Sequence, residues 1–312
     1  MVPARLLIPA VAALAGVLAA APQRPGSNGQ GPGRQAAALP APPRTWKEHW
    51  FEHEQEVRLV ASDGEVAVYY DDKMPEDERT AWIFPFMSRA WRYTKATYGA
   101  FGPPDRLFAL FHQGRYGGGH PSTYFDPSHD RRNVTDCGTD AWNQADVDLP
   151  SHEIGHIVEG ANNGVHESPA FAIWRDSKWI ELYQYDLYLG LGMPKDAERV
   201  FAKFAAQADD FPRPGTHWFR DFFYPAYRDH GRTRLMATFF RLLAKHYPQG
   251  PDEAGGLKYT REMNWGEFLH FLSAAAGRDL RPLARRAFGF PAEWDDQFRR
   301  ARAEFPALTY KP

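Results

Sequence analysis

The sequence predicts an α+β protein, with a small mixed sheet in its first half and mainly helices in its second half. Three observations lead to this prediction. Strand-like apolar runs fall between residues 57 and 112. A segment with helical character, His152-Glu153-Ile154-Gly155-His156, lies at the centre of the chain. After about residue 196, apolar residues recur with a helical period between Pro and Gly breaks.

The amino terminus has the features of a signal peptide. Arg5 precedes an apolar run over residues 6–21 that ends in small residues. We therefore expect residues 1–21 to be removed, and the mature chain to be secreted, extracellular and free of the membrane. Residues 22–44 are rich in Pro, Gly and Ala, which predicts a disordered linker.

The charge and cysteine content narrow the possible functions. The chain has 37 basic and 39 acidic residues and a formal net charge of −2, so no basic surplus points to nucleic acid. Cys137 is the one cysteine, which rules out an intrachain disulfide. We expect it to be a small buried side chain.

The first folded part is predicted over residues 45–195. Residues 57–60 and 66–70 have strand character and flank a turn signal at 62–64. Residues 78–99 have a helical period, and the apolar run 107–112 indicates a buried strand. Three glycines at 117–119 predict the start of a flexible loop.

The second part, residues 196–312, is predicted to be a helical domain. Its apolar periodicity and its Pro and Gly breaks predict five helices, over residues 196–208, 231–246, 264–276, 279–287 and 293–304.

The central motif carries the predicted chemistry. His152 and His156 are four residues apart, so on a helix both imidazoles lie on one face and can hold one metal ion. Glu153 can then take a proton from a zinc-bound water, as a general base. Ser151, after Pro150, is a candidate N-cap for this helix.

A third zinc ligand is expected on a second helix over residues 168–186. Asp176 shares a helical face with apolar residues, and a carboxylate on a buried face needs a partner such as a metal. Glu181 lies on a more polar face and is the alternative ligand. Asp186 is a candidate for orienting a ligand histidine or for a buried salt bridge.

These residues resemble the gluzincin-like peptidases of the thermolysin-like superfamily. The resemblance covers about residues 66–190, and the segment from Ser168 to Ser177 is similar to the family pattern Pro-x-Trp-Leu-x-Glu-Gly-x-Ala. Asp176 lies near the position where the family usually has a glutamate ligand, and its side chain is shorter by one methylene. The resemblance implies a zincin-like fold with a motif helix and a ligand helix, one Zn²⁺ ion, and a helical part that closes the cleft.

The family also has a His or Tyr that stabilises the transition state, and His217, Tyr224 and Tyr227 are the candidates here. The resemblance further implies that the segment upstream of the motif helix, which includes residues 117–126, contacts an extended substrate. We therefore expect a secreted zinc metallopeptidase that acts on a peptide or protein. The alternative is a secreted zinc-binding or carbohydrate- or surface-binding protein whose motif is retained but inactive.

Overall fold

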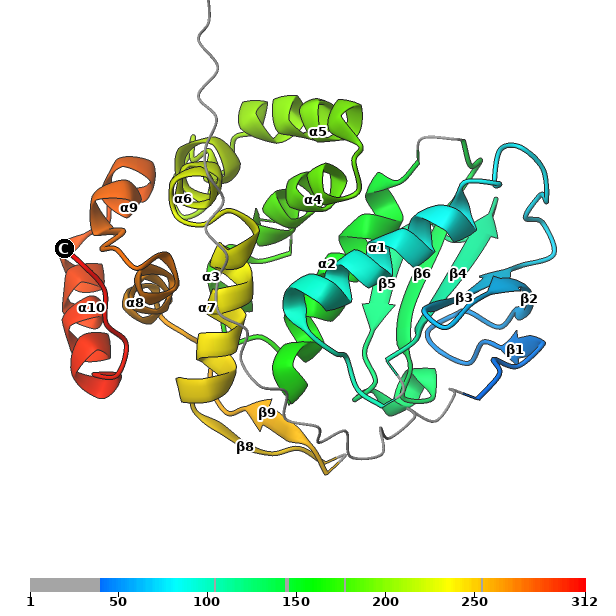
Figure 1. Ribbon diagram of the computed structural model, residues 1–312, viewed down its shortest axis with the longest axis horizontal. Coiled ribbons are helices and arrows are strands. Elements are labelled where there is room, and N and C mark those ends of the chain that lie inside the picture. Colours follow the sequence, from blue (N-terminus) through cyan, green and yellow to red (C-terminus); the bar gives the residue numbers. More distant parts are fainter. Residues whose placement is uncertain (1–39, 104, 144–145, 177, 254) are drawn as a thin grey trace, which may run out of the picture. The chain divides into compact units, whose positions relative to one another are not determined.

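The computed structural model describes residues 40–312, apart from residues 104, 144–145, 177 and 254 (Figure 1). The predicted signal peptide and most of the predicted linker lie outside the described residues. The last residues of the linker range contact the sheet: Arg106 donates a hydrogen bond to the Pro40 carbonyl, and the Tyr69 hydroxyl donates to the Pro43 carbonyl.

The first half forms a six-stranded mixed sheet. Its strands, in spatial order, are β1 (Thr45–Lys47), β2 (Glu56–Ser62), β3 (Val66–Tyr70), β4 (Leu107–Gln113), β6 (Asn133–Thr139) and β5 (Gly118–Ser122). Strands β3, β4 and β6 are parallel, whereas β1, β2 and the edge strand β5 run antiparallel to their neighbours.

Alternation along the strands divides the sheet into two buried faces. Leu107, Ala109 and Phe111 of β4 belong to the main core, with residues of α1 (Ile83–Tyr98) and α2 (Asp148–Ala161). Phe108 and Leu110 point the other way, into a smaller core that contains Trp46 and Trp50. The two helices therefore cover one face, and the segment around β1 covers the other (Figure 1).

The second half is mainly helical. It contains α3 (Phe171–Trp174), α4 (Lys178–Gly190), α5 (Pro194–Ala206), a π-helical turn (Phe219–Phe223), α6 (Tyr224–Asp229), α7 (Thr233–His246), α8 (Trp265–Ala276), α9 (Arg281–Phe288) and α10 (Ala292–Glu304). A small second sheet is formed by β7 (Val165–His166), β9 (Leu257–Tyr259) and β8 (Gln249–Pro251).

The described residues form a mixed sheet and helices, which is compatible with the predicted α+β class, and most predicted elements are present with boundaries that differ by a few residues. Three local predictions are wrong. The glycine segment 117–119 enters the edge strand β5, because its backbone pairs with β6. Ser151 lies inside α2, whose N-cap is Val147. The predicted helix 168–186 is broken at Arg175, which has a φ of 54°.

The two halves share one main core. It runs from Val66 in β3 to Leu308 near the carboxyl terminus, and residues 40–312 belong to one compact unit. The predicted boundary between residues 195 and 196 falls inside α5. Cys137 is fully buried in this core, as predicted.

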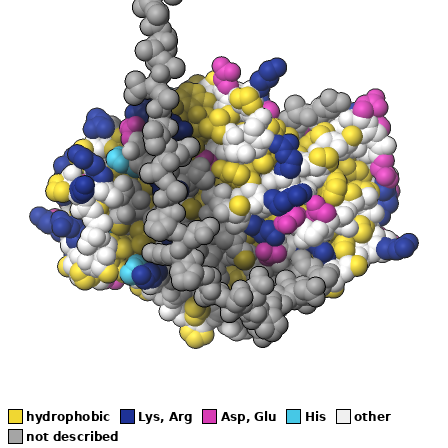
Figure 2. All heavy atoms as spheres, in the orientation of Figure 1, with side chains coloured by type: hydrophobic (Ala, Val, Ile, Leu, Met, Phe, Trp, Pro, Cys, Tyr) yellow, Lys and Arg dark blue, Asp and Glu magenta, His cyan; other side chains and the backbone are white. Residues whose placement is uncertain are grey.

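The surface carries charges of both signs. On the face shown in Figure 2, Lys and Arg side chains are interspersed with Asp and Glu among the described residues. Within the described part of the chain, no helix combines the length and the apolar character needed to cross a bilayer.

Candidate metal centre

Helix α2 presents the two motif histidines as one pair. The Nε2 atoms of His152 and His156 lie 3.2 Å apart. Asp176 completes the group: its Oδ1 is 3.2 Å from His156 Nε2 and its Oδ2 is 3.9 Å from His152 Nε2. Ligand atoms around a tetrahedral zinc ion with bonds of about 2.0–2.1 Å are separated by roughly 3.3 Å. The three side chains therefore have the spacing of a metal site, and all their ligand atoms lie within 4.8 Å.

Asp176 reaches this position because the chain breaks there. Helix α3 ends at Trp174, Arg175 adopts its positive φ, and α4 begins at Lys178. The Arg175 guanidinium stacks on the Phe211 ring at 3.7 Å, which holds the break against the helical half. The Asp176 side chain is 72% exposed, so the prediction of a buried helical face is wrong.

Glu181 has the opposite placement. It lies in the first turn of α4 and is 4% exposed, so the predicted polar face is buried in the structure. Its Oε1 is 3.8 Å from Lys178 Nζ, and burial raises its pKa to about 7. The structure groups Asp176, and not Glu181, with the two histidines.

Glu153 is buried between α2 and the edge strand β5. A Cβ atom added to Gly119 of β5 would lie 2.7 Å from Glu153 Oε1, so only glycine leaves the carboxylate this space. Burial raises the pKa of Glu153 to about 7; nearby His156 opposes this shift, and Asp176 adds to it. Burial and the neighbouring His156 lower the pKa of His152 to about 4, so this imidazole is neutral at pH 7, as a metal ligand must be.

A second carboxylate on α2, that of Glu159, contacts the Nδ1 side of the His156 ring. Glu159 Oε2 lies 3.3 Å from His156 Nδ1, and Glu159 Oε1 accepts a hydrogen bond from Trp174 Nε1. A carboxylate on the far nitrogen fixes the tautomer and orientation of a ligand histidine. Glu159 was not among the residues predicted from the sequence, although its position three residues after His156 places it on the same side of the helix.

Two cavities flank the histidine pair. The larger, of about 710 Å³, includes His156 and Glu159 and extends along Ser122 and Thr123 to the β9 end at Tyr259. The smaller, of about 370 Å³, includes His152, Glu153 and Glu181 with polar side chains that include Gln184, Lys203 and Gln207. The histidine pair therefore lies where both cavities meet α2.

The predicted transition-state residues lie elsewhere. The Tyr227 hydroxyl donates to Asp186 Oδ1 at 2.7 Å, and the Tyr224 ring packs on Phe201 with centroids 4.7 Å apart. His217 Nδ1 is buried and makes no hydrogen bond to the described residues. None of the three is among the described residues that line the two cavities.

Asp186 has neither of its predicted roles. Its carboxylate contacts neither a ligand histidine nor a basic side chain among the described residues, and accepts hydrogen bonds from the hydroxyl groups of Tyr93, Tyr227 and Thr233. This network joins α1, α4, α6 and α7, and is a structural feature of the helical half.

The site thus offers two imidazoles and one carboxylate to a metal ion, with a buried second carboxylate beside them. This donor set matches the chemistry of zinc, which accepts His and Asp ligands and can keep a position open for water. The chain matches no model of a known protein family, and no curated protein matches it significantly.

Proposed function

We propose that this chain is a secreted zinc metallopeptidase with a zincin-like fold. The observation that carries the proposal is the convergence of His152, His156 and Asp176, with the Glu153 carboxylate buried one residue along the same helix. Secretion is proposed from the amino-terminal sequence, and zinc from the donor set.

Each side chain has a defined task in this mechanism. Bound zinc would lower the pKa of a water molecule and polarise a substrate carbonyl. Glu153 accepts a proton from the attacking water and passes it to the leaving amine. Glu159 keeps His156 oriented through Nδ1.

The edge strand supports a peptide as the substrate. β5 ends the sheet order and pairs with β6 alone among the described strands, so its outer edge can accept an extended chain. Gly119 of this strand lies beside Glu153, and Ser122 at its end lines the larger cavity. A peptide added along β5 would therefore run past the histidine pair.

The first test is the substitution Glu153→Gln. We expect peptide hydrolysis to fall by about 10²–10⁴-fold, because the proton acceptor is lost, while bound zinc stays at the wild-type level. The measurements are cleavage of a fluorogenic peptide library and metal analysis of the purified protein. Zinc bound by the wild type without turnover of any library peptide would favour the alternative, an inactive metal-binding protein.

The ligand assignment is tested by a matched pair of truncations. Asp176→Ala should lose one equivalent of zinc relative to the wild type and lose activity with it. Glu181→Ala removes a carboxylate of the same region that is not grouped with the histidines, so its zinc content should be unchanged. Equal zinc in wild type and Asp176→Ala would reject Asp176 as a ligand.

A further inference from the structure

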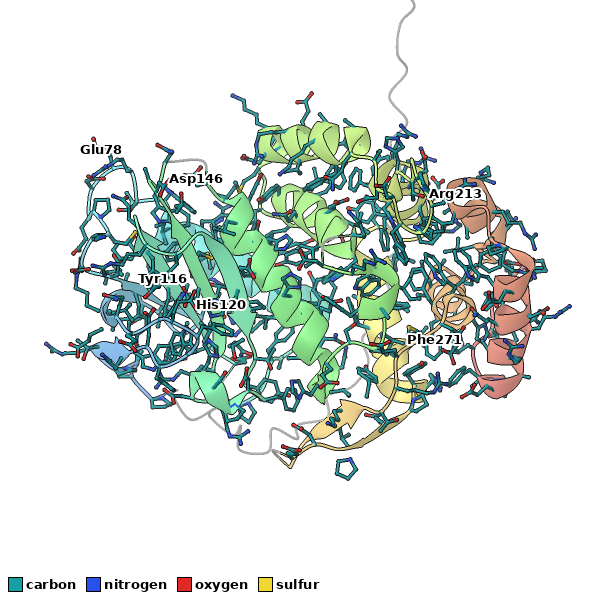
Figure 3. The ribbon with its side chains drawn as sticks, turned by 180° about the vertical axis from the view of Figure 1, so that it is seen from behind. Glu78, Tyr116, His120, Asp146, Arg213 and Phe271 are labelled. Carbon is teal, nitrogen blue, oxygen red and sulfur yellow. The ribbon has the colours of Figure 1, made fainter. Side chains whose placement is uncertain are left out.

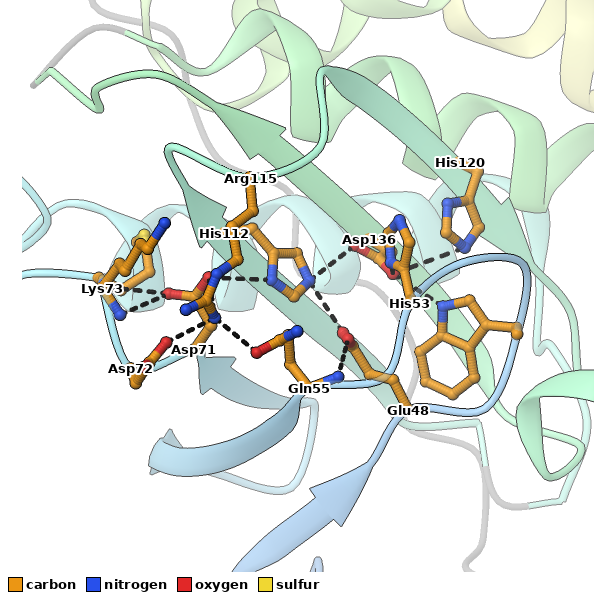
Figure 4. Close-up of polar contacts among 12 residues, drawn as sticks. Glu48, His53, Gln55, Asp71, Asp72, Lys73, His112, Arg115, His120 and Asp136 are labelled. Carbon is orange, nitrogen blue, oxygen red and sulfur yellow. Dashed lines mark hydrogen bonds and ion pairs between the residues drawn. The ribbon is translucent and has the colours of Figure 1, made fainter.

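A second group of metal-spaced side chains lies on the other face of the sheet. Its members are Glu48, His53, His112 and Asp136; all four are buried, and their ligand atoms lie within 4.8 Å of one another. Glu48 and His53 come from the segment between β1 and β2, His112 from β4 and Asp136 from β6 (Figure 4).

Strand alternation brings this group together. His112 continues the inward series Phe108 and Leu110 along β4, and Asp136 continues that of Val134 along β6. The apolar part of this face thus ends in a polar cluster. The segment between β1 and β2 covers this cluster and contributes Glu48 and His53 to it. This face is distinct from the α2 face that carries the motif histidines.

Within the group, His53 Nδ1 lies at hydrogen-bond distance from Asp136 Oδ2, 2.9 Å away, but the contacts of His112 Nε2 do not have the geometry of hydrogen bonds. His112 Nε2 lies 2.9 Å from Glu48 Oε1 and 3.1 Å from Asp136 Oδ1. Both His112 Nε2 and Glu48 Oε1 are nevertheless buried without a hydrogen-bond partner among the described residues. In a hydrogen bond, the proton on Nε2 would point at one carboxylate oxygen. Two ligand atoms bound to the same ion at about 2.0–2.1 Å instead lie roughly 3 Å apart, and both point at the ion and not at each other.

The outer polar atoms of His112, Glu48 and Asp136 have their own partners, as the outer atoms of metal ligands do. These contacts are Asp71 Oδ2 to His112 Nδ1 at 3.3 Å, the Gln55 backbone N–H to Glu48 Oε2 at 3.2 Å, and Trp50 Nε1 to Asp136 Oδ2 at 2.9 Å.

The charge balance also calls for a cation. Glu48, Asp71 and Asp136 place three carboxylates around the two imidazoles of His53 and His112, and each carboxylate is at most 1% exposed. Arg115 approaches from the rim, 3.7 Å from Asp71, but its closest ion pair is with the exposed Asp72 at 2.5 Å. Buried carboxylates without a compensating charge cost several kcal/mol each, and a divalent ion among them would remove that cost.

An ion can reach the group from solvent. A cavity of about 190 Å³ is lined by His53, Asp136, Tyr116 and His120, together with glycines 117–119. The Tyr116 ring stacks on His53 with centroids 3.4 Å apart, and Figure 3 shows Tyr116 and His120 close together beside the sheet.

We propose that Glu48, His53, His112 and Asp136 bind a second divalent transition-metal ion, with zinc as the first candidate. Two nitrogen and two oxygen donors suit a metal of borderline hardness. Four buried protein ligands describe a closed, structural site. The ion would tie the segment after β1 to β4 and β6, a link that no disulfide can supply in a chain with one cysteine.

The test counts metal ions in the full-length protein. We expect two equivalents of zinc in the wild type, one in the double variant His152→Ala/His156→Ala, and one in Glu48→Gln/His53→Ala. His49→Ala, which removes a half-exposed imidazole from the same segment, is the control and should keep two. A count that is unchanged in Glu48→Gln/His53→Ala overturns the proposal, whatever the motif site does.

Two further measurements do not depend on the folding of variants at Glu48 or His53. Anomalous diffraction from wild-type crystals, collected on both sides of the zinc edge, should give a peak within bonding distance of His112 Nε2. In the double variant His152→Ala/His156→Ala, a chelator should lower the unfolding midpoint by about 5 °C, because the ion binds the folded state alone. Absence of that anomalous peak would leave His112 as a protonated imidazole among carboxylates and reject the metal site.

Discussion

At the scale of single residues, the space around Glu153 depends on an absent side chain. Glu153 is 3% exposed and lies against the backbone of β5. Gly119 supplies this space: a Cβ there would approach Glu153 Oε1 to 2.7 Å and Glu153 Cγ to 2.9 Å. Side chains of this kind are held by packing, so an added methyl group must move either the carboxylate or the strand.

We therefore expect Gly119→Ala to lower kcat by about 10–100-fold, since a shift on the order of 1 Å at a catalytic group has effects of this size. Zinc content should stay at the wild-type level, because no ligand is touched. Gly117→Ala is the matched control: a Cβ at that position meets nothing within 4 Å. Full activity in Gly119→Ala, measured beside this control, would contradict the placement of Glu153 against β5.

At the scale of elements, hydrophobic periodicity predicted those helices and strands whose own residues carry a clear apolar pattern. Strand β4 and helix α8 match the predicted runs 107–112 and 264–276 almost residue for residue. Strand β5 was missed, because its two glycines and Pro121 have low strand propensity and only pairing with β6 makes it a strand.

The candidate site was predictable to the same extent. The histidine pair follows from four-residue spacing on one helix. The exposure of Asp176 and the burial of Glu181 were not predictable in this way, because both were assigned to the faces of one continuous helix, which Arg175 interrupts. The group of Glu48, His53, His112 and Asp136 has no short spacing at all, so only the folded sheet reveals it.

Helices α8 and α10 make an unusually close contact that belongs to this scale. A Cβ at Gly266 in the first turn of α8 would lie 2.1 Å from the backbone nitrogen of Phe298 in α10. The start of α8 is fixed by a capping box, in which Asn264 and Glu267 each bind the other's backbone N–H. Neither backbone can therefore give way easily.

Gly266→Ala should consequently lower the free energy of unfolding by about 3 kcal/mol, the upper range for overpacking. Helix propensity alone predicts the opposite sign, a gain of about 1 kcal/mol for Ala over Gly. Ala275→Gly in the same helix is the control for propensity and should cost about 1 kcal/mol. Chemical denaturation measures both, and a stabilised Gly266→Ala would show that the two helices are not in contact here.

At the scale of the whole molecule, the helical half contacts the proposed metal centre directly. Trp174 donates its indole N–H to Glu159, which orients His156. The same indole packs against Phe239 of α7 and Phe268 of α8, with ring centroids 5.6 and 5.9 Å away. The position of a ligand histidine is thus coupled to helices more than 80 residues further along the chain.

This coupling predicts that residues 40–312 unfold in one transition. Trp174 and Trp179 are fully buried against helices of the second half, so a fragment that ends at residue 195 would expose both indoles to water. Truncation of a buried Trp lowers the free energy of unfolding by roughly 3–5 kcal/mol, and we expect exposure of each indole to cost a similar amount. This is a large part of the stability of most domains. Tryptophan fluorescence and far-UV circular dichroism should therefore report the same thermal midpoint, and fragment 40–195 should lack a cooperative transition. Two separate midpoints in the intact chain, or a fragment with a cooperative transition of its own, would mean that the sheet and its metal centre fold without the helices that pack on Trp174.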